Sequence, residues 1–142
     1  RYSENVVCTH DNIKNDNSFS IVNTTDLNVV ADYLLLEMES SRPIDVIGID
    51  EGQFYDDINF FCDLWANYHN KKIIISGLNG DYTRHMFDNL ISLFPICEKI
   101  TKLTSICRCG DDASFTHRKI KDTKQEIIGG KDIYNVITLS KK

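Results

Sequence analysis

Long apolar stretches are missing from this chain of 142 residues. No segment approaches the roughly 20 apolar residues of a membrane-spanning helix, and no signal-like apolar segment opens the sequence. An excess of basic residues is missing as well, because 16 Lys and Arg stand against 21 Asp and Glu. Nucleic-acid binding rests on clustered Lys and Arg, so a formal charge of -5 argues against it. We therefore expect neither a membrane partner nor a nucleic-acid partner.

A disulfide framework and strong internal repeats are also missing. The five cysteines are an odd number, which suits a reducing compartment and predicts a cytoplasmic protein. With 42% apolar and 26% charged residues, the chain has the size and composition of a single domain that can bury a core.

The most informative segment is an apolar run at residues 44–49 that ends in Asp50 and Glu51. Such a run predicts a strand buried on both faces, within a parallel sheet that has helices above and below. Ligands of open α/β sheets bind at the C-terminal edge, where both acids would lie. On an extended segment the two side chains point to opposite sides, so Asp50 could hold Mg²⁺ while Glu51 acts as a general base. The alternative is that Asp50 only caps a turn and Glu51 is solvated.

The surrounding pattern alternates between helix and strand. A cap at Thr25 or Asp26 predicts a helix to about residue 39, and residues 71–76 predict a second parallel strand. A helix after residues 56–57 carries a stripe that we interpret as core, formed by Ile58, Phe61, Leu64, Trp65 and Tyr68. We further expect a short helix over 86–94 closed by Pro95, a strand over 99–106 and a β segment over 113–118. This alternation predicts the α/β class.

Asp-Glu-Gly-Gln-Phe-Tyr at residues 50–55 resembles the signature of the type II thymidine kinases, the cellular and poxviral family that phosphorylates thymidine. Further similar segments follow the family's order and span nearly the whole chain: 1–3, 8–11, 77–82 with Arg84 and Phe87, 102–107, 113–118, and 126–130 through Tyr134. Several ordered motifs carry more weight than any one alone.

The resemblance implies a P-loop NTPase-like parallel sheet over residues 1–103 and a small β lasso over residues 104–142 that closes on the nucleoside. It implies transfer of the γ-phosphoryl of ATP, with Mg²⁺, to the 5′-hydroxyl of thymidine. It also implies a homotetramer and inhibition by thymidine triphosphate.

Carried over residue by residue, the resemblance makes Glu51 the catalytic base and Asp50 the Mg²⁺ residue, and it places Arg1 and Arg118 near the phosphates. The residues it implies around the nucleoside are Gln53, Phe54, Leu78, Tyr82, Phe87, Thr116, Ile127, Ile128, Gly129 and Tyr134. Without the resemblance, these aromatic and apolar residues are ordinary core, the glycine an ordinary turn and the arginines ordinary surface.

Two family features are not matched. No Gly-x-x-x-x-Gly-Lys-Ser/Thr loop occurs in the sequence, which begins at Arg1, so we expect that an N-terminal segment has been left off. The alternatives are a catalytically inactive nucleoside-binding relative and an α/β oligomerisation module. Cys107 and Cys109 are spaced Cys-x-Cys where the family has two Cys-x-x-Cys pairs. Since structural zinc takes four ligands, the two thiols are either part of a zinc site or unliganded.

Overall fold

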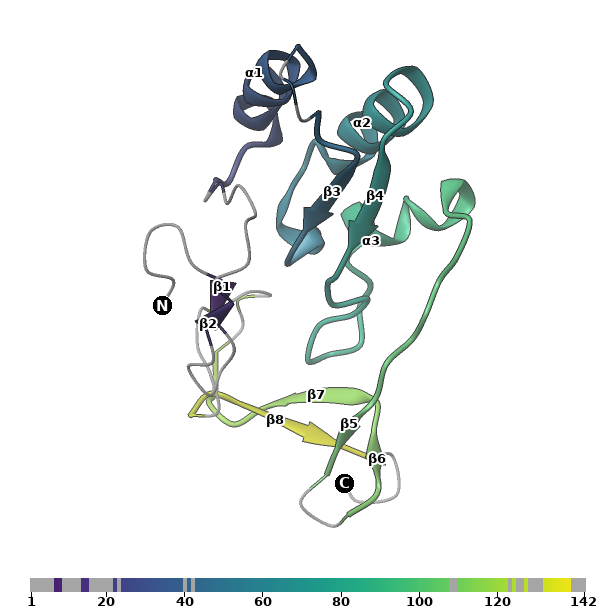
Figure 1. Cartoon of the computed structure of the whole chain (residues 1–142). Coiled ribbons are helices and arrows are strands. Elements are labelled where there is room, and N and C mark those ends of the chain that lie inside the picture. Colours follow the sequence, from purple (N-terminus) through teal and green to yellow (C-terminus); the bar gives the residue numbers. More distant parts are fainter. Residues whose placement is uncertain are drawn as a thin grey trace.

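The computed structural model describes residues 7–8, 14–15, 22, 24–39, 41, 43–107, 110–122, 124, 127 and 132–138. Helices and a small parallel sheet form one part of this mixed α/β structure, and short antiparallel strand pairs form the rest (Figure 1). None of the described helices is long and apolar enough to cross a bilayer.

The parallel sheet consists of β3 (Val46–Ile49) and β4 (Lys72–Ile75). The two strands pair in parallel, with Ile47 opposite Ile73 and Ile49 opposite Ile75. Both strands coincide with predicted apolar runs, so the parallel arrangement is confirmed. The shared direction brings their C-terminal ends to the same edge.

Helix α1 (Leu27–Met38) begins where its cap predicts. The Asp26 carboxylate accepts a hydrogen bond from the Asn28 backbone N–H at 2.9 Å, which satisfies one of the free amides of the first turn. Leu27 and Leu34 are buried, whereas Val29 is exposed, so the buried face of the helix does not include Val29.

Helix α2 (Ile58–Asp63) continues directly into a π-helical turn, η2 (Leu64–Tyr68). Trp65 is 1% exposed, which confirms its predicted place in the core. Tyr68 is 79% exposed, so including it in the core stripe was wrong. The π turn adds a residue to the helical repeat and thereby moves Tyr68 off the face that carries Trp65.

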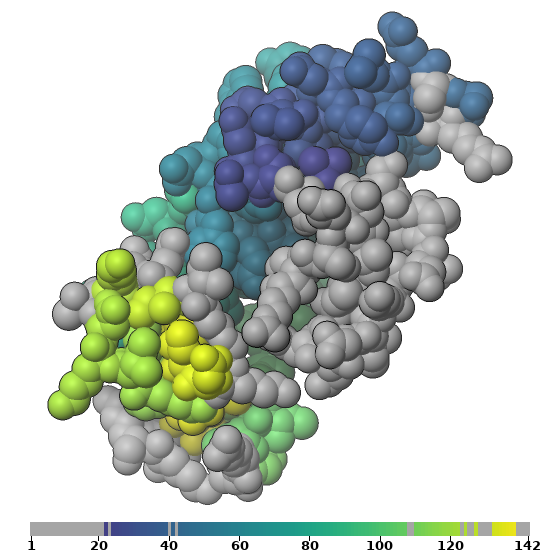
Figure 2. All heavy atoms as spheres, turned by 90° about the vertical axis from the view of Figure 1, so that its left-hand side faces the viewer, coloured from purple at the N-terminus to yellow at the C-terminus, as the bar shows by residue number. Residues whose placement is uncertain are grey.

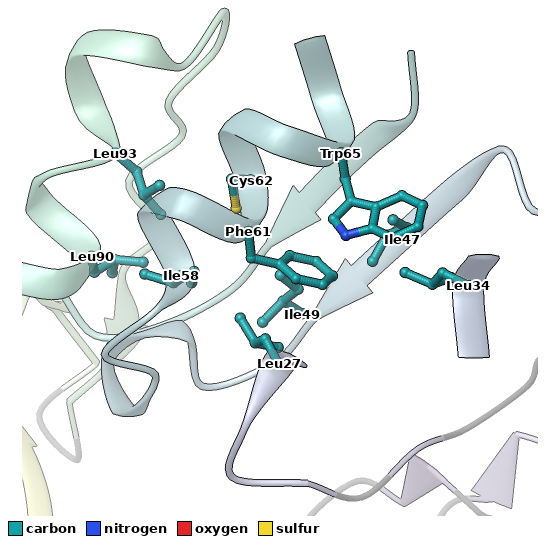
Figure 3. Close-up of a cluster of buried hydrophobic side chains, with 10 residues drawn as sticks. All are labelled: Leu27, Leu34, Ile47, Ile49, Ile58, Phe61, Cys62, Trp65, Leu90 and Leu93. Atoms are coloured by element: carbon teal, nitrogen blue, oxygen red, sulfur yellow. The ribbon is translucent and has the colours of Figure 1, made fainter. Parts of the chain in front are cut away.

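The core lies where α1, α2 and the chain around residue 90 meet β3. Figure 3 shows its side chains pointing toward one another. The cluster contains Leu27, Leu34, Ile47, Ile49, Ile58, Phe61, Cys62, Trp65, Leu90 and Leu93. The rings of Phe61 and Trp65 are 5.9 Å apart, within the range of favourable aromatic contact.

The two faces of the sheet differ in burial. Ile47 and Ile49 belong to the core, but Val46 on the other face is 50% exposed and Ile74 is 54% exposed. Burial of the first strand on both faces was therefore a wrong prediction for the described part of the chain. The reason is that the described core packs on one side of the sheet only.

The region after β4 contains less regular structure than predicted. Helix α3 (Asp88–Ile91) covers only part of the expected 86–94 helix. A 3-10 turn, η3 (Phe94–Ile96), follows and contains Pro95, which therefore does not end the helix. Proline is tolerated in a first turn because its missing N–H would have no intrahelical partner there.

Two antiparallel pairs make up the C-terminal part of the described chain. The first joins β5 (Ser105–Ile106) to β6 (Asp112–Ala113), and the second joins β7 (Phe115–Arg118) to β8 (Tyr134–Ile137). A separate short pair near the N-terminus joins β1 (Val7–Cys8) and β2 (Lys14–Asn15). The expected 99–106 strand is reduced to its last two residues.

β7 and β8 lie at the opposite end of the molecule from α1. Figure 2 shows the yellow and yellow-green atoms of the C-terminal strands gathered at one end and the purple-blue atoms of α1 at the other. In Figure 1 the loop that follows β4 extends toward β7. The loop after β4 therefore begins at the same sheet edge as the acidic end of β3 and extends from there toward the C-terminal strands.

Candidate active site at the end of the parallel strands

Asp50 and Ser76 directly follow the two paired strands. One carboxylate oxygen of Asp50, Oδ1, accepts a hydrogen bond from Ser76 Oγ at 2.6 Å and another from the Glu51 backbone N–H at 3.0 Å. The register explains the contact, because Ile49 and Ile75 are partners and each strand then continues by one residue. Ser76 was missed by the sequence analysis. The sequence feature that could have identified Ser76 is a polar residue at the end of a strand predicted to be parallel to β3.

Glu51 adopts a left-handed backbone conformation, with φ 54° and ψ 44°. The prediction that residues 50 and 51 continue an extended segment was therefore wrong, because the chain turns sharply here into a 3-10 turn, η1 (Gly52–Phe54). This conformation costs an ordinary residue about 1–2 kcal/mol. Such strain is found where the surrounding structure holds the residue, often at functional sites. The Glu51 side chain is exposed.

Gln53 lies within this 3-10 turn and is 2% exposed. Its Nε2 donates a hydrogen bond to Glu51 Oε2 at 2.6 Å, and its Oε1 accepts one from the Leu78 backbone N–H at 2.9 Å. The amide thus connects the acidic turn after β3 with the loop after β4.

Aromatic and apolar side chains lie beside the acidic turn. Phe54 is 49% exposed and Leu78 is 46% exposed. Phe87 is buried and contacts the Phe54 ring edge to face, with ring centroids 6.4 Å apart. The structure therefore brings together three of the residues predicted around a nucleoside. A half-exposed ring supported from behind can stack on a planar base.

The loop over residues 80–86 is organised by Asp81, a buried carboxylate. Asp81 Oδ1 accepts hydrogen bonds from the Thr83 backbone N–H at 2.7 Å, from Thr83 Oγ1 at 2.6 Å and from the His85 backbone N–H at 3.0 Å. Asp81 was part of a predicted motif but had no predicted role. An Asp followed by a short polar turn was the signal for such a local hydrogen-bonded turn.

Tyr82, from the same loop, contacts the C-terminal strands. Its hydroxyl donates a hydrogen bond to the Asp122 carbonyl at 3.2 Å, and its ring is stacked by the Arg118 guanidinium. Tyr134 donates to the Ile127 carbonyl at 3.0 Å. Because Arg118 Nη2 also donates to the Tyr134 hydroxyl, Tyr82, Ile127 and Tyr134 are linked within one network.

The remaining predicted residues are placed as follows. Thr116 is half-buried on β7, opposite Val136 on β8. Arg1, Ile128, Gly129 and Cys109 lie outside the described residues.

The fit of a magnesium ion can be judged at Asp50. Within the described part of the chain, its two hydrogen bonds both go to Oδ1, and the side chain is exposed. Burial raises the pKa of the Tyr55 phenol, and the nearby carboxylates of Asp50, Glu51 and Asp57 raise that pKa further. An exposed carboxylate in this negative surrounding suits a hard divalent cation that keeps several of its waters.

A metal ion held by protein side chains alone needs several ligands close together. Among the described residues, no group of three or more His, Cys, Asp or Glu side chains is arranged to hold a metal ion. Cys107 is described and half-buried, whereas its predicted zinc partner Cys109 lies outside the described residues. Zinc at this pair stays a prediction.

Comparison with known proteins identifies the family. The thymidine kinase family profile matches residues 1–139 of the chain. The chain belongs to the thymidine kinase family. This confirms the resemblance drawn from the motifs.

Individual thymidine kinases support the same assignment. The chain is 45% identical over 100 residues to a thymidine kinase of Oryza sativa subsp. japonica, covering 70% of this chain and 37% of that protein. It is 41% identical over 135 residues to thymidine kinase a of Arabidopsis thaliana, covering 94% and 54%. It is 40% identical over 134 residues to the thymidine kinase of Choristoneura biennis entomopoxvirus, covering 92% and 67%. The chain therefore spans between 37% and 67% of the length of these relatives.

Proposed function

We propose that the protein containing this chain is an ATP-dependent thymidine kinase in which Glu51 is the general base. The observation that carries this proposal is the strained, exposed Glu51 at the end of a parallel strand, held through its carboxylate by a buried amide. Family membership supports thymidine and ATP as the two substrates.

In the proposed reaction, Glu51 accepts the proton of the sugar 5′-hydroxyl as that oxygen attacks the γ-phosphorus of ATP. A bond forms between the 5′-oxygen and the γ-phosphorus, and the bond from that phosphorus to the β–γ bridging oxygen breaks. The products are thymidine monophosphate and ADP. Positioning of the reacting groups and stabilisation of charge supply most of the rate enhancement in phosphoryl transfer.

Asp50 would hold Mg²⁺ through bound water, and the ion would supply neutralisation of the phosphate charge. The hydrogen bonds from Ser76 and from the Glu51 backbone fix the Asp50 carboxylate in one orientation. Phe54 and Leu78, both half-exposed beside the acidic turn, would contact the thymine ring, and Phe87 would support Phe54 from behind.

We further infer a P-loop NTPase-like core over residues 1–103 and a lasso over residues 104–142 that closes on the nucleoside. The contacts of Tyr82 with Asp122 and Arg118 support this arrangement, because they connect the loop after β4 with the segment that follows β7. In the lasso, Thr116, Ile127 and Tyr134 would lie near the nucleoside.

We infer from the family resemblance that the protein is a cytoplasmic homotetramer that thymidine triphosphate inhibits. Light scattering of the full-length protein tests the assembly, and calorimetric titration with thymidine triphosphate tests the inhibitor binding.

The decisive experiment replaces Glu51 by Gln in the full-length protein. This change keeps the size of the side chain and removes its basicity, so the Kd for thymidine should stay within about threefold while kcat falls by about 10²- to 10⁴-fold. Glu98→Gln is the matched control, because Glu98 is an exposed glutamate outside the candidate site and its loss should leave kcat unchanged. Near-normal turnover by Glu51→Gln would remove Glu51 from the base role. Thymidine binding without turnover by the unaltered protein would identify an inactive nucleoside-binding relative.

A further inference from the structure

Gln53 is the most deeply buried polar side chain of the candidate site. It is 2% exposed, whereas Glu51, which it contacts, and Leu78, whose backbone it contacts, are both exposed. A side chain this buried has almost no surface left with which to touch a nucleoside. The family resemblance had placed Gln53 among the nucleoside contacts, and its burial favours a different task.

The two hydrogen bonds fix the orientation of the amide. The Leu78 backbone N–H can only donate, so the atom 2.9 Å from it must be the carbonyl oxygen Oε1. The Glu51 carboxylate can only accept when ionised, so the atom 2.6 Å from it must be the amino nitrogen Nε2. A rotation by 180° about the last side-chain bond would set donor against donor and acceptor against acceptor.

The space around the amide is limited on the loop side. A Cβ atom added to Gly77 would lie 2.6 Å from Gln53 Oε1 and 3.2 Å from the Gly52 backbone nitrogen. Glycine at position 77 therefore lets the loop after β4 approach the amide closely. Asn89 restrains the main chain of the same residue, because its Nδ2 donates to the backbone carbonyl of Gln53 at 3.4 Å.

An exposed glutamate normally samples several rotamers, and fixing it costs conformational entropy. Gln53 restrains the Glu51 carboxylate from its buried side, and it anchors that restraint to the backbone of the loop that carries Leu78. A displacement of the loop at Leu78 would therefore move the Gln53 amide, and the amide would in turn move the Glu51 carboxylate.

We propose that Gln53 is a positioning residue that holds the Glu51 carboxylate in its reactive orientation and couples this orientation to the loop at residues 77–80. This inference rests on the proposed base role of Glu51. Gln53 has no contact with the nucleoside in this account.

The test compares Gln53→Met with Asn67→Met in the full-length protein. Methionine is close to glutamine in length but can make neither hydrogen bond. Asn67 is the matched control, because its Nδ2 also donates to a carboxylate, Asp63 Oδ1, at 2.6 Å, on an exposed part of η2 away from the site. Since a misplacement of about 1 Å can reduce a rate by about 10²-fold, Gln53→Met should lower kcat by about 10- to 100-fold. The thymidine Kd should change by less than about threefold.

Gly77→Ala is the second variant. It keeps the proposal testable if Gln53→Met does not fold. The added methyl group displaces the Gln53 amide without altering Glu51 or Gln53 itself. It should lower kcat in the same way, and adding Gly77→Ala to Gln53→Met should cost little more, because both changes remove the same restraint.

The possible outcomes separate this inference from the proposed function. A fall in kcat for Gln53→Met and for Gly77→Ala, at nearly constant Kd, supports the positioning role. A tenfold or larger rise in the thymidine Kd with constant kcat overturns it and makes Gln53 a substrate contact. Wild-type kcat in either folded variant overturns it as well, while an inactive Glu51→Gln leaves the base role intact. An active Glu51→Gln overturns the proposed function and the inference together.

Discussion

The guanidinium carbon of Arg118 lies 3.7 Å from the centroid of the Tyr82 ring. Arg118 is 6% exposed, and both of its terminal nitrogens are engaged. Nη1 donates to the carbonyls of Asp122 and Lys124, and Nη2 donates to the Tyr134 hydroxyl at 3.0 Å. One arginine thus joins the loop after β4 to the segment between β7 and β8. The family resemblance implies a different role for Arg118, near the phosphates. That role stays a prediction.

Replacing Arg118 by Lys should loosen this junction. A lysine keeps the charge but lacks the planar, forked donor that reaches several acceptors at once and stacks on a ring. We expect the free energy of unfolding to fall by about 2 kcal/mol, because lysine cannot replace all of these hydrogen bonds from a charged donor. Urea denaturation measures this change. Lys121→Met, an exposed substitution three residues along the chain, is the control, and an equal loss in both variants would contradict the junction role.

Replacing Asp50 by Asn should weaken the use of magnesium. Asparagine still accepts hydrogen bonds from Ser76 Oγ and from the Glu51 N–H, but it has no charge with which to hold a hard cation. The Mg²⁺ concentration for half-maximal thymidine phosphorylation should rise by about tenfold or more, since a charged ligand contributes over 1.4 kcal/mol.

Asp45→Asn provides the comparison for Asp50. Asp45 is also an exposed aspartate, but it lies just before β3, at the other end of the strand. Its substitution should leave the Mg²⁺ dependence of activity unchanged. Identical Mg²⁺ titrations for the two variants would exclude Asp50 as the metal residue.

Alanine substitution should have different effects on stability at Gly52 and at Gly48. A Cβ atom at Gly52 would lie 2.6 Å from Ile75 Cγ2 and 3.1 Å from Ile58 Cδ1, so Gly52→Ala should cost about 1–3 kcal/mol through overpacking. A Cβ atom at Gly48 would meet nothing within 4 Å, and Gly48→Ala should be neutral or stabilising by about 0.5 kcal/mol. Thermal unfolding of both variants checks the contrast, and equal losses would contradict the packing described at Gly52.

The Cys62 thiol should resist alkylation. Burial, with a smaller contribution from Cys97, raises the pKa of Cys62 to about 12, whereas a free thiol has a value of 9.0. At pH 8.5 iodoacetamide should therefore modify the exposed Cys97 well before the buried Cys62, because only the thiolate reacts. Peptide mapping of the folded protein measures the order of reaction, and preferential labelling of Cys62 would contradict its burial.

The same pKa shift predicts a loss of stability at high pH. As the pH rises from 9 toward 12, the unfolded chain releases the Cys62 proton while the folded protein keeps it, so the free energy of unfolding falls. Cys62→Ala removes this contribution and should make the fall shallower. Urea denaturation at several pH values compares the two slopes.

Local sequence patterns predict the framework that carries the site. The Asp26 cap, the apolar spacing of α1 and the isoleucine-rich runs of β3 and β4 each reflect interactions between residues close in sequence. These patterns predict a helix over 86–94 that is longer than the observed α3, and they do not predict β8 as a separate strand.

The finer geometry of the site depends on contacts between distant segments. Glutamate has no preference for a left-handed backbone, so nothing local indicates the turn at Glu51. Gln53 contacts a backbone amide 25 residues away. Arg118 contacts the Tyr82 ring across two chain segments. Such partners become visible only once the tertiary fold has brought the segments together.

The turn at Glu51 has a consequence for the selection of thermostable variants of this protein. Glycine is the residue most at ease with φ 54°, so Glu51→Gly relieves the backbone strain, but it also removes the carboxylate that accepts the hydrogen bond of the buried Gln53 amide. A library screened for survival on heating alone would therefore judge position 51 by backbone strain and by this hydrogen bond, and not by proton transfer. Under the proposed base role, only a screen that also requires product would select for a basic carboxylate there.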